Sequence, residues 1–411
     1  MATPYEPRPT SDGVPRPIYD DGPSRAIAVQ LPPVMAQYAR SLLRWRPKCE
    51  ITVLREGAET FPAMLEAIAA ARTSILLEVY ILAADGTGDR FKEVLLERAR
   101  AGVAVRILYD AVGSFGLASS WYDELRDAGV EINAFNPIGL WRRRFRWSHR
   151  DHRKILVVDD QVAFTGGLNI ADDYASADDG GKGWHDMHCR VRGPAVLDLS
   201  RLFRRTWLAI GGRPYPAPAR ASEAPPGPGE SYARVIENSK RRQRGAFRRT
   251  YLHVIKHSRD SVMIENAYFL PEQRVRRALA RAVRRGVKVS VIVPGHSDVK
   301  MVEYASDYVL RRLAKRGVEI LRWQGPMMHA KTAVVDGMWS TIGSYNFDAQ
   351  SRFNNLEVTV EILDPVVGTE MVTEFTESRA NCERYDEAAW LRLPWYRKVL
   401  AWIGYRLRRV L

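Results

Sequence analysis

Two short segments of the chain carry the same set of reactive side chains at the same spacing. Each has a histidine, a lysine two positions later and an aspartate five positions further on: His152, Lys154 and Asp159 in the first, His329, Lys331 and Asp336 in the second. Alternate residues of a strand point to one face, so each segment can present an imidazole and an ammonium group to one phosphate. Imidazole serves as nucleophile or as general acid and base, while ammonium groups stabilise phosphoryl oxygens. The two segments therefore predict phosphodiester cleavage and transfer at one shared site.

Further matched positions follow each segment. Gly167 and Asn169 occupy the same places in the first copy as Ser344 and Asn346 in the second. Small residues let the backbone approach a ligand closely, and asparagine amides can donate to phosphate oxygens. We therefore expect these four residues to support the phosphate. The aspartate of each motif lies at a strand end before a turn, and it could instead anchor that turn.

Each histidine needs an acceptor on its second ring nitrogen to fix its orientation. Two acids near the motifs are candidates, Asp186 after the first copy and Glu357 after the second. We expect them to pair crosswise, Glu357 with His152 and Asp186 with His329, although both could form local salt bridges instead. Weaker candidates for lining the site are two acids at repeat-equivalent strand positions, Glu78 and Glu265.

An internal repeat positions the two motifs. Four blocks recur in the same order, pairing 74–82 with 261–269, 97–111 with 280–295, 123–132 with 311–320 and 152–170 with 329–347. Within each half, β-branched runs alternate with amphipathic helices, which is typical of an α/β fold with helices covering a sheet. We predict a disordered N-terminus with a short amphipathic helix (1–48, the helix at 34–46), two halves (49–210 and 232–385), a Pro/Ala/Gly-rich linker (211–231) and a basic amphipathic C-terminal helix (386–411).

Charge and composition restrict the partner. The chain has 411 residues, a formal net charge of +14 and a pI near 9.8, which favours an anionic partner, either nucleic acid or an acidic membrane surface. No signal peptide is visible, and no apolar run reaches the roughly 20 residues of a membrane-spanning helix, so any membrane contact should be peripheral. The three cysteines have no paired spacing, and His149, His185 and His188 lack a matching ligand set. We therefore expect neither a disulfide framework nor a metal site.

The duplicated motif resembles that of the phospholipase D superfamily, and the resemblance covers residues from about 50 to 365. It implies two similar halves, each a mixed sheet flanked by helices, packed face to face as a pseudo-two-fold pair around one active site. It also implies a covalent phosphohistidine. By analogy His152 is the nucleophile and His329 the general acid and base, with the reverse assignment left open. Neither metal nor cofactor is needed in this scheme, because the two lysines supply the positive charge.

The motif defines a reaction class, and three functions compete for it: a phosphatidyltransferase of the cardiolipin synthase type, a hydrolytic phospholipase D, and a nuclease of the same superfamily. Two segments favour lipid over nucleic acid. The stretch 137–152 interleaves aromatic residues with arginines. The stretch 393–411 places basic residues beside an apolar stripe, as in helices that lie in a membrane surface: Tyr396, Leu400, Ile403, Leu407 and Leu411. The same helix could instead pack on the protein's own core.

The fuller resemblance is to bacterial cardiolipin synthases, through the stretches 149–174, 184–196, 265–271 and 343–358. It implies phosphatidylglycerol as donor and the headgroup hydroxyl of a second phosphatidylglycerol as acceptor, giving cardiolipin and glycerol. The chain resembles the shorter form without N-terminal transmembrane helices, so we expect a peripheral protein on the cytoplasmic face of the bacterial membrane. Because one chain carries both motif copies, a monomer would suffice and no obligate protein partner is expected.

Overall fold

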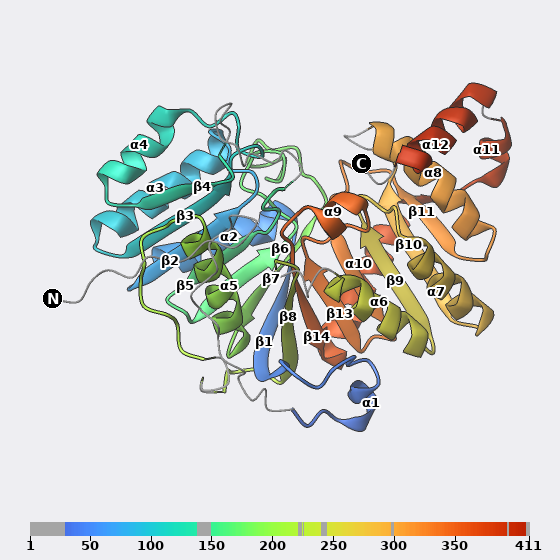
Figure 1. Cartoon of the computed structure of the whole chain (residues 1–411), viewed down its shortest axis with the longest axis horizontal. Helices are drawn as coiled ribbons and strands as arrows, with labels where there is room; N and C mark the ends of the chain where they lie inside the picture. The colour runs from blue at the N-terminus through green and yellow to red at the C-terminus, as the bar shows by residue number, and fades with distance from the viewer. Residues whose placement is uncertain are drawn as a thin grey trace, which may run out of the picture.

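One continuous sheet runs through both halves of the molecule (Figure 1). The computed structural model describes residues 29–137, 149–220, 224, 226–239, 245–296, 300–392 and 394–407. The first half contributes seven strands, in the spatial order β1 (Arg46–Arg55), β7 (Met187–Arg192), β6 (Val162–Gly166), β5 (Ile155–Val158), β2 (Ser74–Val79), β3 (Ala104–Asp110) and β4 (Glu131–Phe135). β2, β3 and β4 are parallel, and the other neighbours in this half are antiparallel.

The second half repeats this order. Its strands run β8 (Ser231–Glu237), β14 (Val358–Leu363), β13 (Trp339–Gly343), β12 (Lys331–Val335), β9 (Ser261–Asn266), β10 (Lys288–Pro294) and β11 (Glu319–Trp323), with β15 (Cys382–Arg384) added at the edge. Here β9, β10 and β11 are the parallel strands. The matching order confirms the predicted pair of similar α/β halves.

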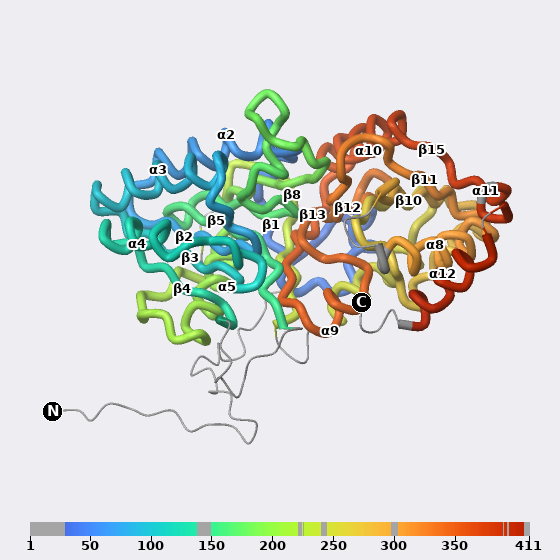
Figure 2. Tube along the Cα trace, turned by 90° about the horizontal axis from the view of Figure 1, so that it is seen from above, coloured from blue at the N-terminus to red at the C-terminus, as the bar shows by residue number. Residues whose placement is uncertain are grey.

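The halves meet in two ways. β1 and β8 pair antiparallel, so the two half-sheets join edge to edge, and Figure 2 shows these strands between the two lobes. The sheet faces also pack together, because one buried apolar cluster combines Ile155 and Val157 of β5 with Val334 of β12 and Val358 and Val360 of β14. The face-to-face packing was expected from the family resemblance, whereas the shared edge was not.

The helices follow the strands along the chain and cover the faces of the sheet (Figure 1). In the first half they are α2 (Glu56–Ala69), α3 (Gly86–Arg100), α4 (Ser119–Asp127) and α5 (Ala195–Ala209). In the second half they are α6 (Ala246–His257), α7 (Gln273–Arg284), α8 (Lys300–Ala314), α9 (Ala349–Phe353) and α10 (Pro365–Ala380). The C-terminal region forms α11 (Glu387–Arg392) and α12 (Trp395–Leu407), with Pro394 between them, where the sequence predicted one helix.

The amphipathic helix predicted at 34–46 is wrong. Only α1 (Pro33–Ala36) is helical, and β1 already begins at Arg46. The chain instead turns so that Tyr38 and Trp45 enter the apolar core of the second half. The Tyr38 hydroxyl donates to Asp336 at 2.7 Å, and the Trp45 indole donates to the carbonyl of Ser41 at 2.9 Å. Burial of two large rings outweighs the weak helical preference of a short segment.

Candidate active site

Each motif histidine is held by a backbone hydrogen bond to the opposite half. The amide of His152 donates to the carbonyl of Leu356 at 3.0 Å, and the amide of His329 donates to the carbonyl of His185 at 2.7 Å. Short bridges between 151 and 356 and between 185 and 328 extend these contacts. Since Leu356 precedes Glu357 and His185 precedes Asp186, each bridge places a carboxylate beside the histidine of the other half.

Both predicted crosswise pairs are present. Nδ1 of His152 lies 3.1 Å from a carboxylate oxygen of Glu357, and Nδ1 of His329 lies 2.7 Å from a carboxylate oxygen of Asp186. All four side chains are buried. At His152 the carboxylate favours the tautomer with its proton on Nδ1, so Nε2 carries the lone pair that can attack or accept a proton. Nδ1 of His329 also lies 2.7 Å from Nζ of Lys331.

The motif lysines are buried close to their histidines. Nζ of Lys154 donates to the carbonyl of His152 at 2.9 Å, and Nζ of Lys331 donates to the carbonyl of His329. Burial lowers the pKa of Lys154 to about 7, and the charge of Lys331 adds to this shift. A phosphate near both ammonium groups would relieve their repulsion and favour their charged forms. The arrangement therefore suits an anionic ligand.

The two histidines are neutral at pH 7. Burial is the largest cause that lowers the pKa of His152, and the charge of Lys154 acts in the same direction. Burial also holds the pKa of His329 well below its usual value, helped by Lys331. A neutral imidazole can act as a nucleophile or a base, so either ring can supply the attacking nitrogen, whereas the ring that acts as acid must first take up a proton.

The small residues after each motif serve the orienting acids, which corrects the expectation that they expose backbone to a ligand. A Cβ at Gly167 would lie 2.1 Å from a carboxylate oxygen of Asp186, so only glycine leaves room for this acid. At the equivalent position, the hydroxyl of Ser344 donates to the carboxylate of Glu357. Gly167 and Ser344 therefore affect the motif histidines by positioning Asp186 and Glu357.

The two asparagines differ in their surroundings. The Asn169 amide donates to the Tyr174 hydroxyl at 2.7 Å, and its carbonyl oxygen accepts from the amide of Ile81 at 3.1 Å. Tyr174 in turn lies 3.4 Å from Nδ1 of His329, so Asn169 supports the site from behind rather than facing a phosphate. The side-chain carbonyl oxygen of Asn346 is buried without a hydrogen-bond partner within the described chain, and its role toward phosphate stays a prediction.

Asp159 and Asp336 anchor turns, which corrects their grouping with the catalytic residues. Asp159 accepts from the backbone amides of Arg72, Thr73 and Ser74 at 2.7 to 2.8 Å. Asp336 accepts in the same way from Arg259, Asp260 and Ser261 at 2.8 to 2.9 Å. Each carboxylate thereby fixes the start of a neighbouring strand, β2 or β9. The sequence left open that these aspartates anchor turns, and their hydrogen bonds agree with that alternative.

The acids Glu78 and Glu265 belong to interior ion-pair networks and not to the lining of the site. Glu78 lies 2.7 Å from the guanidinium of Arg153. Glu265 accepts from the hydroxyl of Thr332 at 3.2 Å and lies 3.9 Å from Nε2 of His185. Among the described residues, no group of three or more acids, histidines and cysteines could hold a metal ion.

His185, which the sequence raised only as a possible metal ligand, is a supporting residue. Its Nδ1 lies 3.0 Å from Glu56 of the first half, and Glu265 of the second half faces its other nitrogen. Its ring stacks on Trp323 with 4.5 Å between centroids. Burial alone would lower the pKa of His185, but the two carboxylates together raise it to about 10. A charged imidazole therefore joins the halves next to Asp186 and His329.

Aromatic rings surround both histidines. Tyr80 lies 5.1 Å from the ring of His152, and Tyr174 and Trp184 lie 5.5 and 5.9 Å from the ring of His329. These rings help to bury both imidazoles. The aromatic and arginine residues predicted to flank the first motif at 138–148 lie outside the described residues.

Comparisons with known proteins agree with this geometry. The family model described as cardiolipin synthase, PLD-like domain, matches residues 64–206 and 251–379, one match in each half. Cardiolipin synthase B of Salmonella typhimurium is 33% identical over 364 residues, covering 86% of each chain. Cardiolipin synthase of Geobacillus kaustophilus is 33% identical over 380 residues, covering 90% of this chain and 75% of that protein.

Solved structures share the fold. The crystal structure of phosphatidylserine synthase from Haemophilus influenzae superposes with a TM-score of 0.68 at 16% identity, covering 88% of this chain and 95% of that one. Polyphosphate kinase from Porphyromonas gingivalis superposes with a TM-score of 0.56 at 15% identity. No helix within the described residues is long and apolar enough to cross a membrane. With a family match in both halves and relatives aligned over most of its length, the chain belongs to the cardiolipin synthase family of phospholipase D-type phosphatidyltransferases.

Proposed function

We propose that this enzyme makes cardiolipin from phosphatidylglycerol in two steps. Binding of the anionic donor phosphate protonates His329, because a nearby negative charge raises the pKa of an imidazole. Nε2 of His152 then attacks the phosphorus of the donor, and the P–O bond to the headgroup breaks as the protonated His329 gives the leaving glycerol a proton. The headgroup hydroxyl of a second phosphatidylglycerol then loses its proton to His329 and attacks the phosphohistidine. The P–N bond breaks, and His152 is released with cardiolipin as product.

The crosswise pairing of the two histidines is the observation that carries this proposal. Each imidazole is neutral, buried and oriented through Nδ1 by a carboxylate of the opposite half. One pair can therefore supply the nucleophile and the other the proton transfer. Lys154 and Lys331 stabilise the charge that develops on the phosphoryl oxygens, an effect that is strong in a water-poor site. The proposed steps use no cofactor, and one chain supplies every group.

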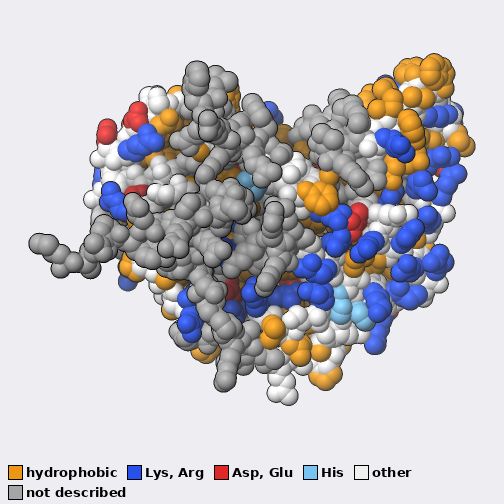
Figure 3. Space-filling view, in the orientation of Figure 1, with side chains coloured by type: hydrophobic (Ala, Val, Ile, Leu, Met, Phe, Trp, Pro, Cys, Tyr) orange, Lys and Arg blue, Asp and Glu red, His pale blue; other side chains and the backbone are white. Residues whose placement is uncertain are grey.

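The C-terminal helix supports contact with a membrane surface. Ala401 of α12 is buried, and the ring centroids of Tyr405 and of Tyr308 of α8 are 4.6 Å apart, so this face packs on the protein. The opposite face exposes a cluster of large apolar side chains, visible in orange at the upper right of Figure 3: Trp395, Tyr396, Val399, Leu400, Trp402 and Ile403. Most of the predicted stripe is thus exposed rather than packed on the core. Exposed apolar patches of this kind mark interaction sites.

Basic residues accompany this apolar face. Arg397, Lys398 and Arg406 lie on the same helix, which suits an anionic lipid surface. We therefore propose that α12 rests in the surface of the bacterial membrane, on its cytoplasmic face, and delivers the site to its lipid substrate. The C-terminal residues 408–411, including Leu411 of the predicted stripe, lie outside the described part of the chain, as does the side chain of Leu407.

A product assay tests the proposed reaction. The purified protein is incubated with phosphatidylglycerol vesicles in EDTA, and the lipids are resolved by mass. We expect cardiolipin and free glycerol, and neither with His152→Ala. Phosphatidic acid as the sole product would show that water is the acceptor and would replace the transferase with a hydrolase. No change in the lipid would refute phosphatidylglycerol as donor.

A further inference from the structure

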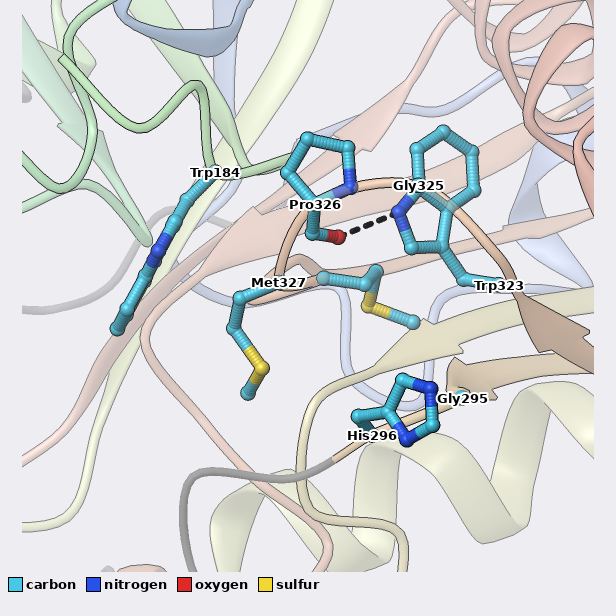
Figure 4. A pocket seen from close by; sticks show the side chains of 8 residues that line it. Trp184, Gly295, His296, Trp323, Gly325, Pro326 and Met327 are labelled. Carbon is cyan, nitrogen blue, oxygen red and sulfur yellow. Dashed lines mark hydrogen bonds between the residues drawn. The ribbon is translucent and has the colours of Figure 1, made fainter.

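A cavity of about 260 Å³ is lined in part by neighbours of His329, Met328 in the chain and Trp184 in space. Its lining comes from the segment before the motif and from two other loops: Trp184, Gly295, His296, Trp323, Gly325, Pro326, Met327 and Met328. Figure 4 shows Trp184 and Trp323 on opposite sides, with the Met327 side chain between them and His296 at one end. The indole of Trp323 donates to the carbonyl of Pro326 at 2.6 Å, so its polar atom is already satisfied.

The wall of the cavity includes residues that lie next to the reacting histidine. Trp184 forms part of its wall and lies 5.9 Å from the His329 ring, and Met328 is the residue directly before His329. A ligand in this cavity would therefore extend toward the imidazole that we assign to proton transfer. Glu357, Tyr80 and Lys154 surround His152 instead, and none of them lines the cavity.

The chemistry of the wall selects an apolar ligand. Two indole rings, two methionines and a proline contribute hydrocarbon or polarisable surface, and methionine adapts to flexible chains. None of the described residues lining the cavity is a lysine or an arginine, so phosphate belongs elsewhere, next to Lys154 and Lys331. The volume holds roughly nine groups the size of a water molecule.

We propose that this cavity binds the carbon skeleton that carries the hydroxyl of the acceptor alcohol during the second step. This inference rests on the proposed function, in which His329 takes the proton of the acceptor hydroxyl. An alcohol with a hydrocarbon portion is held in the cavity with its hydroxyl at His329, whereas water gains nothing from an apolar wall. The cavity thus makes the phosphohistidine react with a lipid alcohol more often than with water.

The test measures how often the phosphohistidine reacts with an alcohol and how often it reacts with water. The enzyme receives phosphatidylglycerol in detergent micelles with ethanol, butanol or hexanol, and the phosphatidylalcohol and phosphatidic acid formed are quantified. For the wild type, the ratio of alcohol product to phosphatidic acid should rise by up to about fourfold per added methylene, the factor for burying one methylene group, until the cavity is full. Met327→Trp fills the cavity and should flatten this rise.

Two further variants make the result interpretable. His296→Trp narrows the cavity from an exposed position, so it reports on the cavity even where Met327→Trp folds poorly. Val366→Trp adds the same ring at a site that is 76% exposed and distant in the sequence, and it should keep the wild-type slope. The acceptor cavity would be refuted if neither cavity variant changed the rise of the product ratio with alcohol length. It would also be refuted if the cavity variants consumed less phosphatidylglycerol than the wild type by the same factor with every alcohol. No consumption of phosphatidylglycerol by the wild type would refute the proposed function itself.

Discussion

Gly167→Ala should disable proton transfer without touching a reacting group. The added Cβ would lie 2.1 Å from the nearer carboxylate oxygen of Asp186, and ordinary contact begins at 3.4 Å. The acid must therefore retreat by about 1.3 Å, the difference between these distances, from its 2.7 Å contact with His329. Displacements of about 1 Å in a supporting residue are enough to cost on the order of a hundredfold in rate.

The size of the loss follows from the contact that breaks. A hydrogen bond to a charged partner contributes about 1.5–3 kcal/mol. His329 must be aligned in the transition state, so loss of this hydrogen bond should lower kcat by roughly ten- to a hundredfold. Initial rates of phosphatidylglycerol turnover measure it. Gly116→Ala is the matched control, because a Cβ there meets nothing within 4 Å, and its rate should equal that of the wild type.

A double mutant decides whether Asp186 transmits the effect. Asp186→Ala removes the group that the new Cβ would meet, so Gly167→Ala should add less than about twofold in that background. The unfolding midpoint of each variant checks that the fold survives. Full activity of Gly167→Ala, or a double mutant far slower than Asp186→Ala alone, would show that Gly167 does not act by making room for this acid.

Three further outcomes are expected. His185 has a folded pKa of about 10, above the unfolded value near 6.5, so its stabilising charge is complete below pH 6.5 and is lost as the pH rises toward 10. The gap in unfolding midpoint between wild type and His185→Gln should narrow over that window, and a constant gap would contradict a charged His185. Asp336→Ala should lower the free energy of unfolding in urea by about 2 kcal/mol, because three backbone amides lose their acceptor, while turnover per folded molecule stays within about twofold. A large drop in turnover with unchanged stability would return Asp336 to the chemistry. Trp402→Glu should weaken sedimentation with phosphatidylglycerol vesicles by about tenfold or more, whereas Val366→Glu should not; equal binding by both would remove α12 from the membrane contact.

The internal repeat allowed the two-half arrangement of the protein to be predicted from the sequence. Two matched motifs imply two similar halves, and a histidine that needs an orienting acid narrows the choice to few carboxylates. Crosswise pairing was proposed beside the alternative of local salt bridges, and Glu357 and Asp186 make the crosswise contacts.

Contacts between distant segments could not be predicted in this way. Local spacing says nothing about the Cβ space at Gly167, which depends on an acid nineteen positions away. The apolar spacing at 34–46 also fits a helix, yet Tyr38 and Trp45 are spaced for burial in a core built by the second half. His185 attracts notice only when Glu56 and Glu265 are seen on either side of it.

The N-terminal segment has a consequence for synthesis of the protein. Tyr38 emerges from the ribosome early, but its hydrogen-bond partner Asp336 follows 298 residues later. At about 5–20 residues per second, the partner arrives roughly 15 to 60 seconds afterwards. In the earlier part of that interval, until β8 has been made, the β1 edge that will pair with it is also uncovered. The first half therefore spends translation with an open strand edge and unburied aromatic rings, the surfaces that holding chaperones recognise.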